Sequence, residues 1–512
     1  MSDGNAFRVV LIKPSKYTAA GDLERFRKGF MPASTLHHMR SMTPPDLDGR
    51  PVTVEIIDEY IETDLRYLDH LRPECCSLLA LVGVQSHQMH RALDLAALAR
   101  TNGVRNCIIG GPHAMTCDTT EVQGRGVSFA MAEAELIWPQ ILRDAIRGEL
   151  RPAYGTERRW QADLDPPVLI PPQRSLLRRY IIPMLGIYPA RGCPYNCSFC
   201  SVVKIAGKRI RSQPVETTVL SVVAARKEGV RMVIFTSDNF NKYPQARALL
   251  KALIEKDVRM PFFVQCDAQI GHDEELIELL ARAGCIQLFV GMESFSRATL
   301  HAVRKHHNDP TQYEKIIRLC AKHGIPTHFS NIIGFPEQDE NGIFEHLAEL
   351  RRLRPFMASF YILTPIPGTD QYEELLAAGL IEDRNLDRAD GACLTWRHPH
   401  LSAERLEALL YGAYRDFYNM PDIIAKVLRH RWSRNQWWVR GIELGYSLFS
   451  RFTASRGLHP MAGGLGRVKR DGIRDYLTLR KKIFGIEQLQ LPRSLALLNP
   501  SDQYLHPAAA AT

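Results

Sequence analysis

The sequence has no apolar run that approaches the roughly 20 residues a helix needs to cross a membrane, which argues against a membrane-spanning segment. Its first residues also lack a basic start followed by an uninterrupted apolar stretch, so no secretory signal peptide is expected. These two absences predict a cytoplasmic protein. The composition, 45% hydrophobic and 24% charged, is that of an ordinary globular protein, and a net charge of +9 decides little about partners.

Cysteine is scarce and mostly scattered. Eleven cysteines in 512 residues, in a reducing compartment, do not predict a disulfide framework. Eight are scattered along the chain, mostly in apolar surroundings, where a cysteine usually serves as a small core residue. These eight are Cys75, Cys76, Cys107, Cys117, Cys266, Cys285, Cys320 and Cys393. The other three lie together in RGCPYNCSFC, and only they predict a site.

Residues 1–148 alternate short apolar runs with helical stretches. The runs FRVVLI, VTVEIID, CSLLALVGV and NCIIGG are typical of buried strands, because β-branched residues dominate and turn residues bound them. Strand and helix in alternation predict an α/β domain with a doubly wound parallel sheet, whose ligands sit beyond the carboxyl ends of the strands. The residues expected along that rim are Pro14, Ser86, Gly110, Gly111, Pro112 and His113.

Three further regions follow. Residues 149–182 are rich in proline and arginine, and prolines at that density predict a linker. Residues 183–370 hold six more strand–helix units, which predict a partial or complete barrel of the TIM type with its site at the carboxyl ends of the strands. Residues 371–512 are expected to be mostly helical.

Three cysteines in one short loop, Cys193, Cys197 and Cys200, directly follow the first predicted strand of the barrel. Three thiolates can hold three corners of a [4Fe–4S] cluster and leave the fourth iron open to another ligand. A structural zinc site is the alternative, but zinc usually takes four protein ligands in paired CxxC units. The triplet therefore favours a cluster that performs chemistry over one that only carries electrons.

CxxxCxxC with an aromatic residue before the last cysteine, here Phe199, resembles the signature of radical S-adenosylmethionine (SAM) enzymes. In that family the open iron chelates the methionine part of SAM, and electron donation yields a 5′-deoxyadenosyl radical. The resemblance places Asp238 of FTSDNF near the methionine amino group and Gln265 of VQCDAQI, with Asp267, near the ribose. It also identifies Glu293 of LFVGMES as a SAM contact, and NIIGFPEQDE and TPIPGT as the fifth and sixth strand ends.

The run IIGGPHAMT, which contains Gly110 to His113, is by itself compatible with a simple tight turn. In a doubly wound domain placed before a radical domain, it resembles the cobalamin-binding domain of the B12-dependent radical SAM enzymes. MAEAE stands where those enzymes often have Gly-Glu-Gly-Glu, so that Glu133 and Glu135 are retained and both glycines are lost. No Asp-x-His-x-x-Gly motif supplies an axial histidine, although several members of this branch also lack one.

The C-terminal region has two alternative interpretations. In AKVLRHRWSRNQWWVRG, arginines alternate with tryptophans, a composition found in helices that lie on anionic membranes and also in ordinary packed helices. Nucleic-acid binding is a poorer fit, because the basic residues form no recognised module. The residues concerned are Arg429, Arg431, Trp432, Arg434, Trp437, Trp438 and Arg440.

The resemblance implies a cobalamin-dependent radical SAM methyltransferase, of the group that includes the anaerobic magnesium-protoporphyrin cyclase. One SAM would methylate cobalamin and a second would generate the radical that activates an unactivated carbon. Relatives with this layout act on lipophilic tetrapyrroles or isoprenoid lipids, and an external donor such as flavodoxin or ferredoxin would supply electrons. The alternatives are a radical cyclase or ring-rearranging enzyme with the same cofactors, and a non-enzymatic Fe–S or cobalamin sensor. The catalytic residues remain unassigned.

Overall fold

The computed structural model describes residues 6–18, 20–161, 163–429, 437–461, 464–468 and 474–496. Its first sheet has the order β3-β4-β1-β5-β6-β7-β8, with all neighbours parallel except β3 and β4. The predicted doubly wound sheet is confirmed. Its strands are β1 (Phe7–Lys13), β3 (Asp46–Leu47), β4 (Arg50–Asp58), β5 (Leu78–Leu81), β6 (Cys107–Gly110), β7 (Ser128–Ala130) and β8 (Ala153–Tyr154).

Helices cover both faces of this sheet. One apolar cluster joins one face to α2, and another joins the opposite face to α1 and α4. The strands are apolar on both sides because each face lies against a helix layer. The helices are α1 (Ser34–Met42), α2 (Met89–Thr101), the short α3 (Pro112–Thr116) and α4 (Ala134–Arg147).

The second sheet is a partial barrel of six parallel strands that follow one another in chain order. The first and last strands do not pair with each other, so the barrel is open, as the six predicted units allow. Its strands are β9 (Met184–Ile187), β12 (Met232–Phe235), β13 (Phe262–Cys266), β14 (Cys285–Glu293), β15 (Thr327–Ile333) and β16 (Met357–Ile362). Its helices are α7 (Val215–Lys227), α8 (Ala246–Glu255), α9 (Glu274–Ala283), α10 (Arg297–Ala302), α11 (Tyr313–Lys322) and α12 (Glu340–Leu353).

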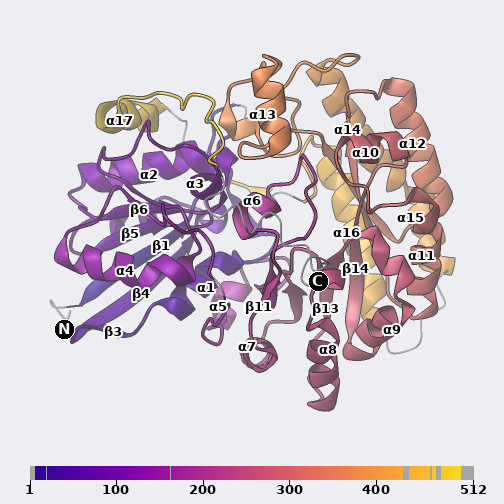
Figure 1. The fold of residues 1–512 in the computed structure, drawn as a ribbon, viewed down its shortest axis with the longest axis horizontal. Helices are drawn as coiled ribbons and strands as arrows, with labels where there is room; N and C mark the ends of the chain where they lie inside the picture. The colour runs from indigo at the N-terminus through magenta and orange to yellow at the C-terminus, as the bar shows by residue number, and fades with distance from the viewer. Residues whose placement is uncertain are drawn as a thin grey trace, which may run out of the picture.

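A small hairpin after β9 lies between the two sheets. In it β10 (Ala190–Arg191) pairs antiparallel with β11 (Arg211–Ser212), and α6 (Val202–Ala206) lies between them in the chain. Figure 1 shows the first sheet on the left, the barrel on the right and α6 between them. The segment for which a linker is predicted contributes β8 to the first sheet and also holds α5 (Arg174–Leu177).

The C-terminal region is mostly helical, as predicted, but it also returns to the first domain. Strand β17 (Gly464–Arg467) pairs with β2 (Phe26–Gly29), and α17 packs against α2 (Figure 1). Of the arginines and tryptophans singled out in the sequence, Arg431, Trp432 and Arg434 lie outside the described residues. The helices are α13 (Asp370–Ala377), α14 (Ala403–Phe417), α15 (Met420–Arg429), α16 (Trp437–Ala454) and α17 (Arg474–Phe484).

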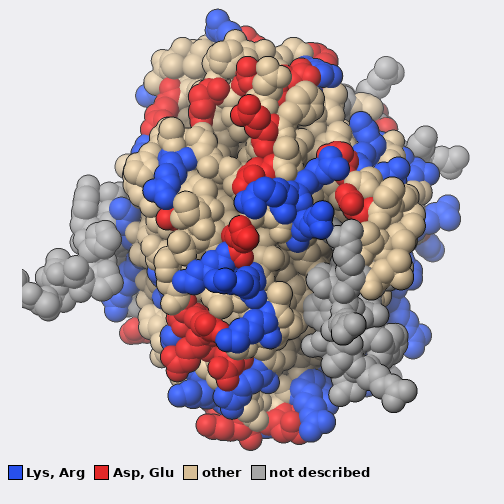
Figure 2. All heavy atoms as spheres, turned by 90° about the vertical axis from the view of Figure 1, so that its right-hand side faces the viewer, with Lys and Arg blue, Asp and Glu red and all other residues tan. Residues whose placement is uncertain are grey.

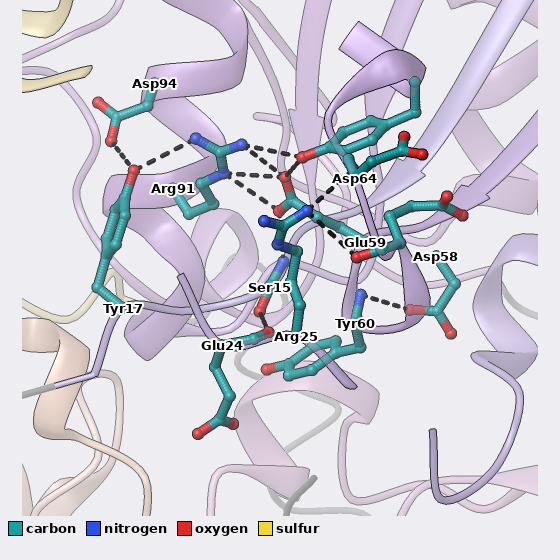
Figure 3. Close-up of polar contacts among 12 residues, drawn as sticks. Ser15, Tyr17, Glu24, Arg25, Asp58, Glu59, Tyr60, Asp64, Arg91 and Asp94 are labelled. Carbon is teal, nitrogen blue, oxygen red and sulfur yellow. Dashed lines mark hydrogen bonds and ion pairs between the residues drawn. The ribbon is translucent and has the colours of Figure 1, made fainter. Parts of the chain in front are cut away.

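A buried polar network fixes the loops at the carboxyl edge of the first sheet (Figure 3). Arg91 of α2 and Glu59 form an ion pair at 2.6 Å, and neither side chain is exposed. The second Glu59 oxygen accepts a hydrogen bond from the Ser15 backbone at 2.8 Å, which holds the loop after β1. The Tyr17 hydroxyl donates a hydrogen bond to the Asp94 carboxylate at 2.6 Å, which extends this network to a second residue of α2.

No helix in the described part of the chain is both long enough and apolar enough to cross a membrane.

Candidate active site

The cysteine loop runs from the end of β10 to α6, and three contacts outside it fix its path. Gly192 has a φ of +103°, and a Cβ there would lie 2.2 Å from the Arg209 carbonyl oxygen, so only glycine fits this approach. The Ser198 backbone N–H donates to the Val303 carbonyl at 3.0 Å, and its carbonyl accepts from the Gln371 N–H at 2.9 Å. The loop is therefore held against the barrel by segments far along the chain.

All three thiols of the loop are partly exposed and lie near one another, since each changes the electrostatic environment of a neighbour. Burial raises the pKa of Cys193 to about 11 and that of Cys200 to about 12, and it also raises the pKa of Cys197. Thiolates at these positions therefore need a cation to stabilise them, and iron would supply it.

The donor set distinguishes a cluster from a single ion. Among the described residues, no group of three or more His, Cys, Asp or Glu side chains is arranged to hold one metal ion. A [4Fe–4S] cluster makes a different demand, because each thiolate binds a separate iron at a corner of the cube. Three thiols on one short loop therefore fit a cluster better than zinc, which needs four ligands around one point.

Asp238 follows β12 and lies against the start of the cysteine loop. Its Oδ2 accepts a hydrogen bond from the Gly192 backbone N–H at 2.6 Å. Burial raises the pKa of Asp238 to about 6. The structure thus brings this predicted SAM residue to the cysteine loop, where it orients the backbone one residue before the first cysteine.

Glu293 ends β14 in a left-handed backbone conformation, with a φ of +67°, that is uncommon for a residue other than glycine. It is buried, and its carboxylate lies 3.4 Å from Lys305 Nζ and 3.4 Å from Ser330 Oγ. Burial raises the pKa of Glu293. Although burial alone lowers the pKa of Lys305, the Glu293 carboxylate and the neighbouring cysteines raise it overall, so that the ammonium stays charged.

Lys305 is the site residue that sequence reasoning missed. Its ammonium lies 5.9 Å from the centre of the Phe199 ring and also acts on Cys197 and Cys200, so it joins Glu293 to the cysteine loop. The only signal in the sequence is a lysine twelve residues after Glu293, in a segment with no recognisable periodicity.

The remaining predicted SAM residues lie on the same barrel. Gln265 is half-buried on β13, and Phe199 packs against the barrel core. Asp267 does not have a free carboxylate, because Asn239 and Asn241 donate to its two oxygens at 2.8 and 2.7 Å. This arrangement makes Asp267 a support for the loops after β12 and β13.

The edge of the first sheet faces a largely apolar cavity of about 230 Å³ that extends to the barrel. Gly110, Gly111 and Pro112 line it from one side, and Tyr188 and Ile205 line it from the barrel side. Gly111 has a φ of +138°, and a Cβ there would lie 2.2 Å from the Val84 nitrogen. Glycine at this position therefore lets the turn approach the end of β5 closely.

Three other residues predicted for the rim do not line this cavity. His113 is buried behind the turn, where its Nδ1 lies 3.0 Å from Ser86 Oγ. Burial lowers the pKa of His113 to about 3. Pro14 is also buried, and its carbonyl accepts a hydrogen bond from Gln88 at 2.8 Å. These residues support the rim rather than present groups to the cavity.

The two glutamates of MAEAE connect the first domain to the cysteine loop. The Glu133 carboxylate forms an ion pair with the Arg211 guanidinium at 2.5 Å, and the Glu135 carboxylate forms one with the Arg191 guanidinium at 2.6 Å. Arg191 also lies 3.3 Å from Glu133, and it stands two residues before Cys193. These nearly buried ion pairs hold the β10–β11 hairpin against the first domain.

A second, more polar cavity of about 440 Å³ also lies between the first domain and the barrel. Lys13 and His87 line it from the edge of the first sheet, Tyr361 from β16, and His459 from the C-terminal region. Tyr361 lies close enough to Glu293 for the Glu293 charge to raise the pKa of the Tyr361 hydroxyl. This cavity therefore extends from the rim of the first sheet toward the predicted SAM site.

Comparison with known proteins supports this description. Residues 187–350 match the family model of the radical SAM superfamily. The chain is 26% identical over 422 residues to bacteriochlorophyllide d C-8(2)-methyltransferase of Chlorobaculum tepidum, covering 76% of this chain and 86% of that protein. It is 26% identical over 287 residues to hopanoid C-2 methylase of Rhodopseudomonas palustris, covering 53% of each.

Among solved structures, the radical SAM methyltransferase TsrM from Kitasatospora setae, with cobalamin and a [4Fe–4S] cluster bound, superposes with a TM-score of 0.60. The match covers 86% of this chain and 99% of that one at 14% identity, so it shows a common fold. The resemblance read from the cysteine triplet and the strand ends is confirmed. The barrel of this chain belongs to the radical SAM superfamily.

Proposed function

We propose that this protein is a cobalamin-dependent radical SAM methyltransferase that methylates an unactivated carbon of a lipophilic substrate, a tetrapyrrole or an isoprenoid lipid. The observation that carries the proposal is the apolar cavity of about 230 Å³. In it the Gly110–Pro112 turn of a doubly wound domain faces the hairpin that carries the cysteine loop. Relatives that methylate bacteriochlorophyllide and hopanoids favour the substrate class.

On this proposal Cys193, Cys197 and Cys200 hold the cluster. When bound, the cluster and SAM supply a 5′-deoxyadenosyl radical, and cobalamin supplies the methyl group. Asp238 fixes the start of the cysteine loop through the Gly192 N–H. Lys305, charged beside Glu293, is suited to hold the carboxylate of the methionine part of SAM.

Phe199, Gln265 and Glu293 complete the proposed SAM site, on the grounds that Phe199 packs from the cysteine loop against the barrel core and the other two lie on barrel strands. Gly110, Gly111 and Pro112 offer cobalamin a backbone surface without bulky side chains. Because His113 is buried behind this surface and does not line the cavity, we propose that it gives no axial ligand to cobalt. Ser86 and Pro14 act from behind the rim as well.

We also propose a cytoplasmic enzyme that receives its electrons from an external donor such as flavodoxin or ferredoxin and that contacts the inner face of the membrane peripherally. The partly exposed thiols of the cysteine loop support an external electron donor, because electron transfer requires a cluster near the surface.

The test is an assay of the anaerobically reconstituted protein, loaded with cobalamin and given SAM and dithionite. We expect about four irons per chain and release of 5′-deoxyadenosine, with S-adenosylhomocysteine formed as well. Cys197→Ser should lose the iron and both products, whereas Cys75→Ser, at an exposed cysteine outside the site, should keep them.

Two other results would lead elsewhere. If a tetrapyrrole or an isoprenoid lipid is added as substrate, 5′-deoxyadenosine forms without S-adenosylhomocysteine, and that substrate loses hydrogen rather than gains a CH2 unit, the enzyme is a cyclase or a ring-rearranging enzyme. If neither product forms from the fully loaded protein, the proposal of an enzyme fails and a sensor replaces it.

A further inference from the structure

Two neighbouring helices of the C-terminal region, α15 and α16, present an unusual number of apolar side chains to solvent. Eleven large apolar side chains are exposed in the described part of the chain, and six of them belong to these two helices. The most exposed are Leu428, at 78%, and Ile424, at 52%. The six are Met420, Ile424 and Leu428 on α15, and Leu444, Leu448 and Phe452 on α16. They define what we call the α15–α16 apolar face.

The spacing of the exposed apolar side chains shows that they form one continuous stripe along each helix. Both sets of three recur every four residues, so each set covers a sector of about 80° on its helix. The other side of α16 is packed: Ser447, Ser450 and Ala454 are buried, and the helix contacts α14 and α15. An amphipathic helix usually turns its apolar stripe toward the core. Here apolar stripes also face outward, which marks an interaction surface.

The sequence of these two helices and the residues beside them has a net positive charge. Residues 415–429 and 437–456 contain six Lys or Arg and three Asp or Glu. Two of the three acids are engaged, because Asp416 lies 3.1 Å from Arg351 and Asp422 accepts from Asn419 at 2.7 Å. Figure 2 shows the side on which α15 is labelled in Figure 1, where charged side chains are interspersed with broad uncharged areas.

A cation also lies directly beside one of the apolar residues. The guanidinium of Arg456 is 3.4 Å from the centre of the Phe452 ring. The guanidinium of Arg451 donates to the carbonyls of Arg415 and Tyr418 at the end of α14. Apolar stripes bordered by arginine match the interface of an anionic bilayer, where side chains enter the acyl boundary and cations remain among the headgroups.

We propose that the α15–α16 apolar face docks this protein on an anionic lipid surface. The occupant follows from charge: a two-fold contact with a second copy would bring two positive faces together, whereas an anionic bilayer attracts them. The purpose of this docking rests on the proposed function, because a lipophilic substrate is concentrated in the membrane. The lipid contact itself requires no catalysis.

The experiment is flotation of the full-length, cofactor-loaded protein with vesicles of phosphatidylcholine alone or with 30% phosphatidylglycerol added, about a typical anionic fraction for binding work. We expect the wild type to float with the anionic vesicles and to be partly released by 0.5 M NaCl, since salt screens surface charge to about 4 Å. The variant Leu448→Glu/Phe452→Glu should bind at least about tenfold less, because two carboxylates replace apolar side chains that would enter the acyl boundary.

Phe344→Glu is the matched control, because Phe344 is a similarly exposed side chain, at 49%, on α12 outside this face. It should float like the wild type, and all three proteins should melt alike and release 5′-deoxyadenosine alike. Equal flotation of the double variant and the wild type overturns the proposal, as does a wild type that stays with the soluble fraction. A wild-type dimer that the double variant dissociates also overturns it, in favour of a second copy. A lipid-binding protein that makes no 5′-deoxyadenosine sinks the proposed function alone.

Discussion

At the scale of single residues, Lys305 makes the most testable contact of the site. Its ammonium lies between Glu293 and the cysteine loop, where a SAM carboxylate would need a cation. A contact with a charged group contributes about 1.5–3 kcal/mol, so Lys305→Met should raise the Kd for SAM by about ten- to a hundredfold. Isothermal titration of cluster-loaded protein measures it. Lys322→Met removes an exposed partner of Glu274 and should leave the Kd unchanged.

His113 gives a residue-scale prediction for pH. Its folded pKa of about 3 lies below the unfolded value of about 6.5, because burial disfavours the charged ring. The folded state therefore stays neutral where the unfolded chain takes up a proton. The stability that follows is complete above about pH 6.5 and is lost as the pH falls from there toward 3.

Between pH 6.5 and 5 this loss amounts to about 2 kcal/mol. We expect the midpoint temperature of His113→Gln to change less over that range than the wild-type value does. His70→Gln, at an exposed histidine paired with Glu55, serves as the control and should follow the wild type. The absorbance spectrum of cobalamin bound to His113→Gln should match that of the wild type. A shifted cobalt spectrum would instead make His113 an axial ligand.

Distance along the chain decided which site residues the sequence could reveal. Cys193, Cys197 and Cys200 fall within eight residues, so their spacing alone predicts a shared ligand. By contrast, Glu133 meets Arg211 from 78 residues away, and a pair so far apart leaves no pattern in the sequence. The same holds for Lys305, whose partners come from two different strand ends.

At the scale of elements, the turn between β6 and α3 depends on Gly111. A Cβ at this position would lie 2.2 Å from the Val84 nitrogen, and backbone cannot move aside cheaply. Gly111→Ala should therefore destabilise the first domain by more than about 3 kcal/mol and abolish cobalamin binding. Gly148→Ala tests the strain alone, because its φ is +74° but its Cβ would meet nothing. It should cost only about 1–2 kcal/mol by thermal melting and leave cobalamin bound.

The hairpin that carries the cysteine loop is held by Glu133. Replacing Glu133 by glutamine leaves the Arg211 guanidinium buried beside a neutral partner, and a broken buried pair costs about 3–5 kcal/mol. We expect Glu133→Gln to melt earlier and to retain less iron after reconstitution, because Arg211 of the β10–β11 hairpin loses its anchor on the first domain. Glu216→Gln breaks an exposed pair with Lys256 and should change stability by less than about 1 kcal/mol. Full iron retention in Glu133→Gln would reduce the ion pair to a purely structural role.

Most strands of both sheets were predictable, because buried parallel strands appear as continuous runs of β-branched residues. β3, β7 and β8 of the first sheet were not, since they have only two or three residues each. The order of strands in the first sheet also depends on helix packing that no single run reveals. For the same reason, the segment predicted as a linker contains the last strand of that sheet.

At the scale of the whole molecule, the C-terminal region returns to the first domain. β17 pairs with β2, and α17 lies on α2, so the C-terminal region contacts both the barrel and the first domain. The polar cavity of about 440 Å³ is thus bounded by three regions of the chain, since His459 and Met461 of the C-terminal region line it. Through α17 the C-terminal region also closes the first domain on the side of α2.

The contact that secures this closure is a buried pair between Arg480 of α17 and Asp94 of α2. Both bonds measure 2.7 Å, and neither side chain is more than 1% exposed. Arg480→Met leaves the Asp94 carboxylate buried without its cation, at a cost of about 3–5 kcal/mol. We expect faster amide hydrogen exchange in α2 and α17, while the barrel strands exchange as before. Lys481→Met, one residue on, removes only an exposed partner of Glu487 and should leave both helices protected. If α2 keeps its protection in Arg480→Met, the first domain is closed by its own contacts, and α17 only covers it.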